Sequence, residues 1–192
     1  MEKLKIYELS ISEDDTLGMD GVSLVECPAV EVNFLTFNEQ KPIQLQFNES
    51  RHIISGVALL ADTPIYRNNG VYGEHYIVFT KETIRKMVER YSKNQLLNSV
   101  NIEHNDNQFV EGVTMIESYF IDHERGIIPV EFSNIPDGSW IVSFKVNNKD
   151  VWDLIKEGEV KGFSIQGFFN YGDEVNMNKE LTFDEWIDEL LK

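Results

Sequence analysis

The chain has 192 residues, of which 42% are hydrophobic and only five are prolines, so it can bury one sizeable core and is not of a disordered type. Its 33 acidic and 17 basic residues give a formal net charge of -16, which disfavours DNA or RNA as partners because phosphate backbones are bound by clustered Lys and Arg. Neither a long apolar run nor a basic start followed by an apolar stretch is present, so we expect no membrane span, no secretion signal and a cytoplasmic location.

The first fifty residues are predicted to be extended. Residues 4–11 alternate loosely between apolar and polar types, as in a strand, and residues 12–21 are acidic and rich in turn formers. Residues 22–37 are again extended, and residues 38–50 are a polar stretch suited to a connection. We therefore expect residues 1–50 to form an extended N-terminal arm.

Clearer patterns begin at residue 51. An apolar strand is predicted over residues 52–60, and Asn68-Asn69-Gly70 predicts a hairpin turn between strands at 65–67 and 72–79. Thr80 is a candidate helix cap, because four apolar residues follow at the spacing of one helical face. These residues are Ile84, Met87, Val88 and Tyr91. The stripe predicts a helix that packs on a sheet or barrel.

Strands and short turns continue along the chain. The predicted strands are 100–104, 109–121, 127–132 and 140–146. A short helix is expected next, capped by Asn148 or Asp150 and ended by Gly158 in a left-handed conformation. A last strand then carries Ser164.

Many strands joined by short turns, with a few helices between them, predict a mostly β fold with peripheral helices, in the α+β class. We expect an antiparallel sheet or barrel over residues 51–176, as one domain. Residues 177–192 contain a capping-box pattern that begins at Thr182, followed by an apolar face, which predicts an acidic amphipathic helix. That helix can dock on its own domain, which we favour, or on a partner.

Two short segments carry candidate chemistry. One is a strand-like run that ends in Ile102-Glu103-His104-Asn105, and the other is GFSIQGF at residues 162–168. A serine hydroxyl is a poor nucleophile unless a base, usually a histidine, lies within hydrogen-bond reach. His104 and Ser164 are therefore a candidate base and nucleophile. The alternative is a core histidine and an ordinary strand serine, and residue types alone do not decide between the two.

Neither a metal nor a cofactor is expected. Glu103, His104 and Asp106 could bind a metal only if a loop brought them together, because adjacent strand positions face opposite sides. The single cysteine, Cys27, cannot form an internal disulfide, and its neighbours supply no activating base. We expect Cys27 to be a buried or edge residue.

Several further segments have an informative order and spacing. They are residues 21–25, 27–34, 56–59, 62–67, 76–79, 100–105, 110–113, 138–140 and 158–168. Among them are VNIEHN at 100–105 and GEVKGFSIQGF at 158–168. No one motif is specific, but together they resemble the prohead, or capsid-maturation, serine proteases of tailed phages, particularly the XkdF-type branch.

The resemblance implies that His104 is the base and Ser164 the nucleophile of a serine endopeptidase that forms an acyl-enzyme. It also implies a distant similarity to herpesvirus assemblin, a closed antiparallel β-barrel ringed by helices. Assemblin has a second histidine after its serine, whereas the last histidine here, His123, precedes Ser164. Two alternatives stay open for the third catalytic group. Either an acidic residue orients the histidine, or the site is a Ser-His dyad in which water or backbone orients the ring. The acidic candidates are Glu111, Glu117, Asp173 and Glu174.

As a capsid-maturation protease, the chain would cleave the scaffold protein, the amino-terminal segment of the major capsid protein, or both, and itself. It would act in the host cytoplasm, inside the assembling prohead, with no nucleic acid or membrane partner; a homo-oligomer is compatible with this role. The rival interpretation is a non-enzymatic virion or scaffold-associated binding module on the same fold. A small esterase-like hydrolase is disfavoured because the chain has no Gly-x-Ser-x-Gly elbow.

Overall fold

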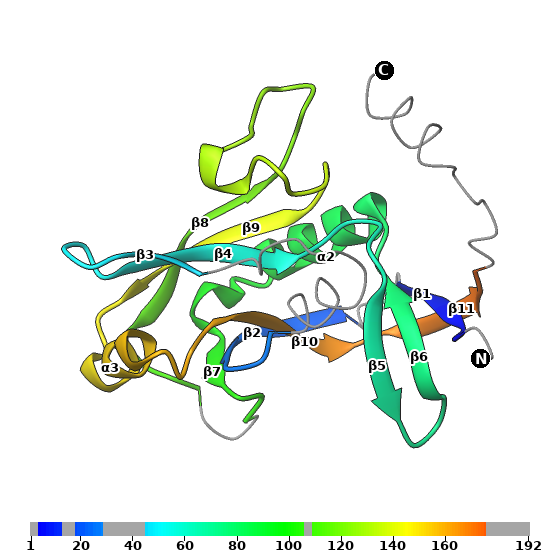
Figure 1. The fold of residues 1–192 in the computed structure, drawn as a ribbon, viewed down its shortest axis with the longest axis horizontal. Coiled ribbons are helices and arrows are strands. Elements are labelled where there is room, and N and C mark those ends of the chain that lie inside the picture. Colours follow the sequence, from blue (N-terminus) through cyan, green and yellow to red (C-terminus); the bar gives the residue numbers. More distant parts are fainter. Residues whose placement is uncertain (1–3, 13–17, 29–44, 106–108, 176–192) are drawn as a thin grey trace.

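The computed structural model describes residues 4–12, 18–28, 45–105 and 109–175, which form short strands and two α-helices (Figure 1). The strands are β1 (Ile6–Ser10), β2 (Gly18–Val25), β3 (Gln46–Asn48), β4 (Ile53–Leu59), β5 (Ile65–Asn69), β6 (Gly73–Val78), β7 (Val100–Ile102), β8 (Val113–Phe120), β9 (Trp140–Val146), β10 (Gly162–Phe168) and β11 (Asn170–Glu174). The helices are α2 (Lys81–Lys93) and α3 (Lys149–Glu157), with 3-10 turns at Leu96–Asn98 and Val130–Phe132. The expected α+β class is confirmed.

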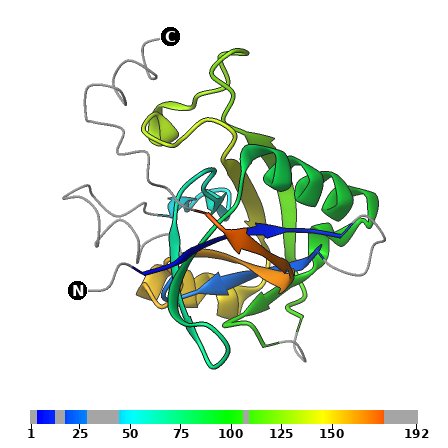
Figure 2. The same ribbon diagram turned by 90° about the vertical axis from the view of Figure 1, so that its right-hand side faces the viewer.

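The strands fall into three sheets. Their orders are β11-β1-β6-β5, β10-β2-β7 and β3-β4-β9-β8. The β1–β6 and β2–β7 pairs are parallel, and the other pairs are antiparallel. Figure 2 shows that the sheets surround a common interior, which the long helix α2 covers on one side.

The described strands do not form the closed antiparallel barrel that the resemblance to capsid-maturation proteases implies. No sheet among them closes on itself, and two of their strand pairs are parallel. Bulges interrupt the pairing of β10 with β2 and of β4 with β9, and such bulges bend strands and end regular ladders. Neighbouring sheets are instead held by apolar side chains, including those of Phe144 and Phe163, whose ring centroids lie 5.3 Å apart.

Three described strands come from the stretch expected as an N-terminal arm, and all three pair with later parts of the chain, β3 with β4. Strand β1 lies between β11 and β6, and β2 lies between β10 and β7. Residues 4–12 and 18–28 therefore contribute to the same sheets as the region 51–176. The expected helix at 177–192 lies outside the described residues.

The two predicted helices that fall on described residues are present where their caps indicate. The Thr80 side chain accepts a hydrogen bond from the backbone N–H of Thr83 at 3.3 Å, and α2 buries its apolar stripe. The Asn148 side chain caps α3, and Gly158 ends it with a positive φ of 75°. The strand predicted at 127–132 is wrong: Pro129 has no N–H to donate to a ladder, and a 3-10 turn follows it.

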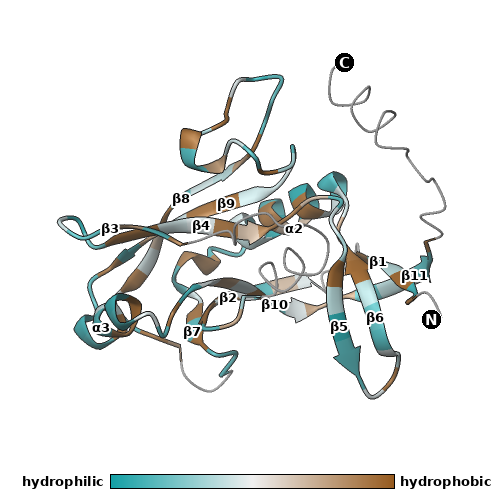
Figure 3. Cartoon of the chain, in the orientation of Figure 1, coloured by the Kyte–Doolittle hydropathy of each residue, from teal (hydrophilic) through white to brown (hydrophobic). Residues whose placement is uncertain are grey.

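The apolar residues gather in the interior. Hydrophobic colouring concentrates on β4 and β9 and on parts of α2 (Figure 3). Trp140 and Phe144 of β9 and Leu24 of β2 are fully buried in this core. No helix in the described part of the chain is long and apolar enough to cross a membrane.

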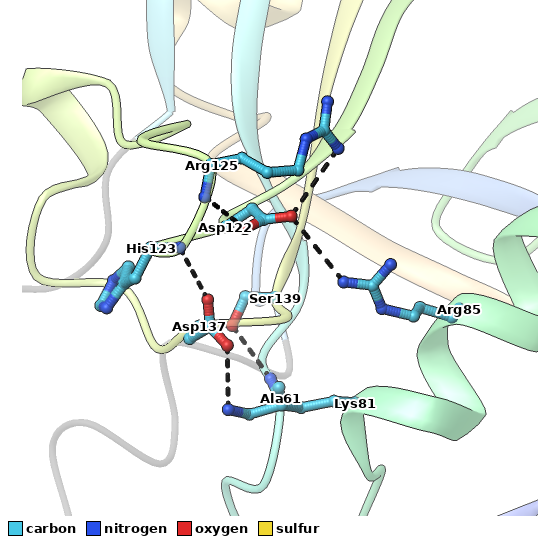
Figure 4. A network of polar contacts seen from close by, with 8 residues as sticks. All are labelled: Ala61, Lys81, Arg85, Asp122, His123, Arg125, Asp137 and Ser139. Atoms are coloured by element: carbon cyan, nitrogen blue, oxygen red, sulfur yellow. Dashed lines mark hydrogen bonds and ion pairs between the residues drawn. The ribbon is translucent and has the colours of Figure 1, made fainter. Parts of the chain in front are cut away.

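A polar network joins α2 to the connection between β8 and β9 (Figure 4). Asp137 accepts hydrogen bonds from Lys81 Nζ at 3.0 Å and from the backbone N–H of His123 at 2.9 Å. Asp122 lies 4.0 Å from Arg85 and 3.7 Å from Arg125. These contacts hold the end of the connection against the start of the helix.

Candidate active site

Three polar side chains lie in a row across the sheet β10-β2-β7. Ser164 of β10 is the direct partner of Ser23 of β2, and Ser23 is the partner of Asn101 of β7. Directly paired residues on neighbouring strands point to the same face of a sheet. The other face carries apolar residues such as Phe163 and Leu24, which belong to the core. The polar row therefore lies on the face away from that core.

His104 follows β7 and bends back toward this row. Glu103 and His104 both have positive φ angles, 52° and 56°, which are uncommon for residues other than glycine and occur often at functional sites. The Glu103 carboxylate accepts a hydrogen bond of 2.5 Å from the backbone N–H of Glu26, which ties the bend to the end of β2. As a result, His104 Nδ1 lies 3.0 Å from Ser23 Oγ, in the middle of the row.

The hydrogen bonds of Ser23 determine which nitrogen of His104 carries the proton. Ser23 Oγ donates its single proton to Asn101 Oδ1 at 2.6 Å, so toward the imidazole it acts as an acceptor. Nδ1 is then protonated, and in the neutral ring Nε2 carries the lone pair. Asn101 is itself held by a hydrogen bond of 2.5 Å from its Nδ2 to Gln166 Oε1. This tautomer is the one that a base acting through Nε2 requires.

Ser164 and His104 line one cavity, which has a volume of about 760 Å³. Most of the other described lining residues are apolar, among them Leu9, Phe79 and Phe168. Ser164 is 8% exposed, whereas Ser23 is completely buried and is not part of the lining. Ser164 therefore borders the cavity directly, whereas Ser23 is connected to it through its contact with His104.

The four acidic residues considered as a third catalytic group lie outside the described lining of the cavity. Glu117 accepts a hydrogen bond of 2.5 Å from Ser143 on the sheet β3-β4-β9-β8, and Glu174 pairs with Lys5 at 3.0 Å. Glu111 and Asp173 are exposed. Among the described lining residues of the cavity, none is an aspartate or a glutamate.

Sequence reasoning missed Ser23 and Asn101 as members of the site. The sequence did contain a sign of Ser23. Val22 and Leu24 on either side of it are core residues, and this alternation leaves Ser23 on the opposite face of the strand. Nothing local shows that this face would lie beside His104, because Ser23 and His104 are 81 residues apart in the chain.

Cys27 is exposed and lines the same cavity, rather than being buried as one of the two expectations had it. It lies two residues after the end of β2, beyond the row of polar side chains. Within the described ranges, no group of three His, Cys, Asp or Glu side chains could hold a metal ion. The described lining thus offers the Ser164 hydroxyl, the His104 imidazole and the Cys27 thiol as candidate reactive groups.

A serine and a histidine that line one cavity are the two groups that a serine hydrolase needs as nucleophile and base. A family model described as "Putative phage serine protease XkdF" matches residues 47–172. The chain therefore belongs to this family of phage serine proteases. His104, Asn101 and Ser164 lie inside the matched range, and Ser23 lies before it. No curated protein and no solved structure matches the chain.

Proposed function

We propose that this chain is a serine endopeptidase that cleaves scaffold and capsid protein segments, and itself, during prohead maturation in the host cytoplasm. The observation that carries the proposal is the shared cavity of Ser164 and His104, in which the His104 ring is oriented by Ser23. Family membership supports the peptidase chemistry. The choice of scaffold and capsid proteins as partners rests on the resemblance to capsid-maturation proteases, as does a distant kinship with assemblin.

The reaction would be an acyl transfer. His104 Nε2 takes the proton of Ser164 as its Oγ attacks the peptide carbonyl carbon, which forms a C–O bond and a tetrahedral intermediate. The imidazolium returns this proton to the leaving amine as the C–N bond breaks. A water molecule then attacks the acyl-enzyme, gives one proton to His104, and releases the carboxylate product. His104 finally returns the proton to Ser164 Oγ.

Ser23 and Asn101 would take the orienting role that an aspartate has in a Ser-His-Asp triad. A neutral hydroxyl fixes the ring and its tautomer, but it stabilises the imidazolium less than a carboxylate does. We therefore expect a slower chemical step than an aspartate in that position would give.

The proposal is tested by expressing the chain with the phage scaffold and major capsid proteins and measuring intact masses. We expect truncated products with the wild type and none with Ser164→Ala or His104→Ala. A fluorophosphonate probe should label Ser164, as read by peptide mass spectrometry, and His104→Ala should abolish the labelling. Ser133→Ala, which changes an exposed serine outside the cavity lining, is the matched control and should behave as wild type.

Identical cleavage products from wild type and Ser164→Ala would contradict the proposal. That result, together with retained binding of the scaffold protein, would instead favour the non-enzymatic binding module.

A further inference from the structure

Arg67 is a half-buried cation in the wall of the proposed active-site cavity. It lies on β5, where it pairs with His75 of β6, and it lines the same cavity as Ser164 and His104. The described lining near it includes Ile65 and Tyr66 and contains no aspartate or glutamate. Among the described lining residues, Arg67 is therefore the one whose side chain is permanently charged.

The guanidinium of Arg67 has only partial compensation for its burial. Nη1 donates a hydrogen bond of 2.9 Å to the backbone carbonyl of Tyr66. Burial lowers the pKa of Arg67, and the neighbouring Tyr171 offsets this only in part. In the part of the chain that the structure describes, no carboxylate lies within ion-pair distance of Arg67, although the chain has 33 acidic residues.

A half-buried guanidinium without an ion-pair partner favours a carboxylate as its ligand. It has five N–H donors in a planar fork, and a carboxylate can accept two of them side by side. Removing a charge from water is costly unless an opposite charge meets it, so an acidic group that enters the cavity would gain more there than at the surface. Neutral and basic groups gain no such pairing.

We propose that Arg67 binds an acidic side chain of the peptide substrate, so that the peptidase selects sequences with Asp or Glu close to the scissile bond. The inference rests on the proposed function, because it assigns a substrate class to the same cavity. It makes Arg67 a specificity-determining residue and leaves the chemical step to Ser164 and His104. The overall charge of -16 repels acidic peptides at long range, so the preference for Asp or Glu has to come from the local contact with Arg67.

The experiment uses full-length protein and amidated, internally quenched decapeptides that are randomised except at one fixed position. The fixed position is moved along the peptide, and at each place it carries Glu, Gln or Lys. The value of kcat/KM is measured for each peptide set. We expect the wild type to prefer Glu over Gln by about 10- to 100-fold at one position near the cleaved bond. Arg67→Met keeps the apolar stem and should reduce that ratio to about 1 while cleavage of the Gln peptides persists.

Two further variants sharpen the result. Arg67→Glu should favour Lys over Glu at the same position, and Arg51→Met, which changes an exposed arginine outside the cavity lining, should keep the wild-type ratio. Binding of the same Glu and Gln peptides to Ser164→Ala, followed by fluorescence anisotropy, gives the preference without catalysis. Circular dichroism checks that each variant is folded.

Each outcome has a separate meaning. Cleavage by the wild type with no Glu preference at any position overturns the role of Arg67 and leaves the peptidase proposal standing. An Arg67→Met variant that loses rate equally on Glu and Gln peptides also overturns it, because Arg67 would then act on a group common to all peptides. If no peptide is cleaved but Ser164→Ala binds Glu peptides more tightly, the recognition stands and the proposed catalysis fails.

Discussion

At the scale of single residues, the position of one proton decides what His104 can do. Ser23 gives its proton to Asn101, and Nδ1 of His104 must therefore supply the proton of the next hydrogen bond. Nε2 is left as the basic nitrogen. A chain of neutral groups thus selects a tautomer that many serine hydrolases select with a carboxylate.

Ser23→Ala should lower kcat about 10- to 100-fold with little change in KM, because the ring loses its orienting partner but the cavity keeps its shape. The rate of Ser164 labelling by a fluorophosphonate should fall by a similar factor. Ser55→Ala is the control, since Ser55 makes a comparable hydrogen bond of 2.7 Å to Ser143 on another sheet. An unchanged kcat in Ser23→Ala, or an equal loss in Ser55→Ala, would refute the orienting role.

At the scale of elements, the pairing of β2 with β10 brings the two serines together. The strands run antiparallel from Gly162 opposite Val25 to Phe168 opposite Gly18, with a bulge between Gln166 and Gly167. The bulge needs a residue without a side chain, because a Cβ on Gly167 would lie 2.1 Å from the carbonyl oxygen of Gly18. Glycine at 167 is therefore required for the register that sets Ser164 beside Ser23.

Gly167→Ala should lower the free energy of unfolding by at least about 1–3 kcal/mol, since backbone atoms of β2 would have to move. Urea unfolding followed by circular dichroism measures this change. Gly70→Ala, at an exposed turn where a Cβ would meet nothing within 4 Å, should leave the stability nearly unchanged. Equal midpoints for the two variants would show that the close approach at Gly167 does not constrain the strands.

At the scale of the whole molecule, α2 and the connection between β8 and β9 are held together by charges at the surface. The hydrogen bond from the His123 backbone N–H to Asp137, aided by Lys81, lowers the pKa of the Asp137 carboxyl below its usual 3.8. Because the folded state holds this carboxylate more strongly than the unfolded state does, the stabilisation is full above about pH 4. It is lost as the pH falls through the lowered pKa of the folded protein.

Asp137→Asn should therefore reduce stability at pH 7, and the difference from wild type should shrink as the pH is lowered from about 5 to about 3. Asp62, whose pKa is raised by burial, acts in the opposite direction but is present in both proteins. Urea unfolding at several pH values measures the two curves, with Asp173→Asn on the exposed strand β11 as a control for the change of charge. A constant difference across this range would contradict the assigned role.

Local sequence was sufficient for features that depend on near neighbours. The cap at Thr80, the buried stripe of α2, the hairpin after β5 and the ends of α3 follow from residues within a few positions of one another. The strand expected at 127–132 failed for a local reason as well, since Pro129 cannot join a ladder. The family was also readable, because its motifs keep their order along the chain.

Residue patterns alone were enough to predict the class of fold, the helices α2 and α3, and His104 and Ser164 as the candidate base and nucleophile. Three features appear only in the folded chain: Ser23 and Asn101 lie beside this pair, the described strands form three sheets and not a barrel, and Arg67 lines the same cavity. The physical reason is distance along the chain. Ser23 and Asn101 are 78 residues apart, and contacts at that separation arise from how strands pair and how sheets pack, which no local pattern of residues specifies.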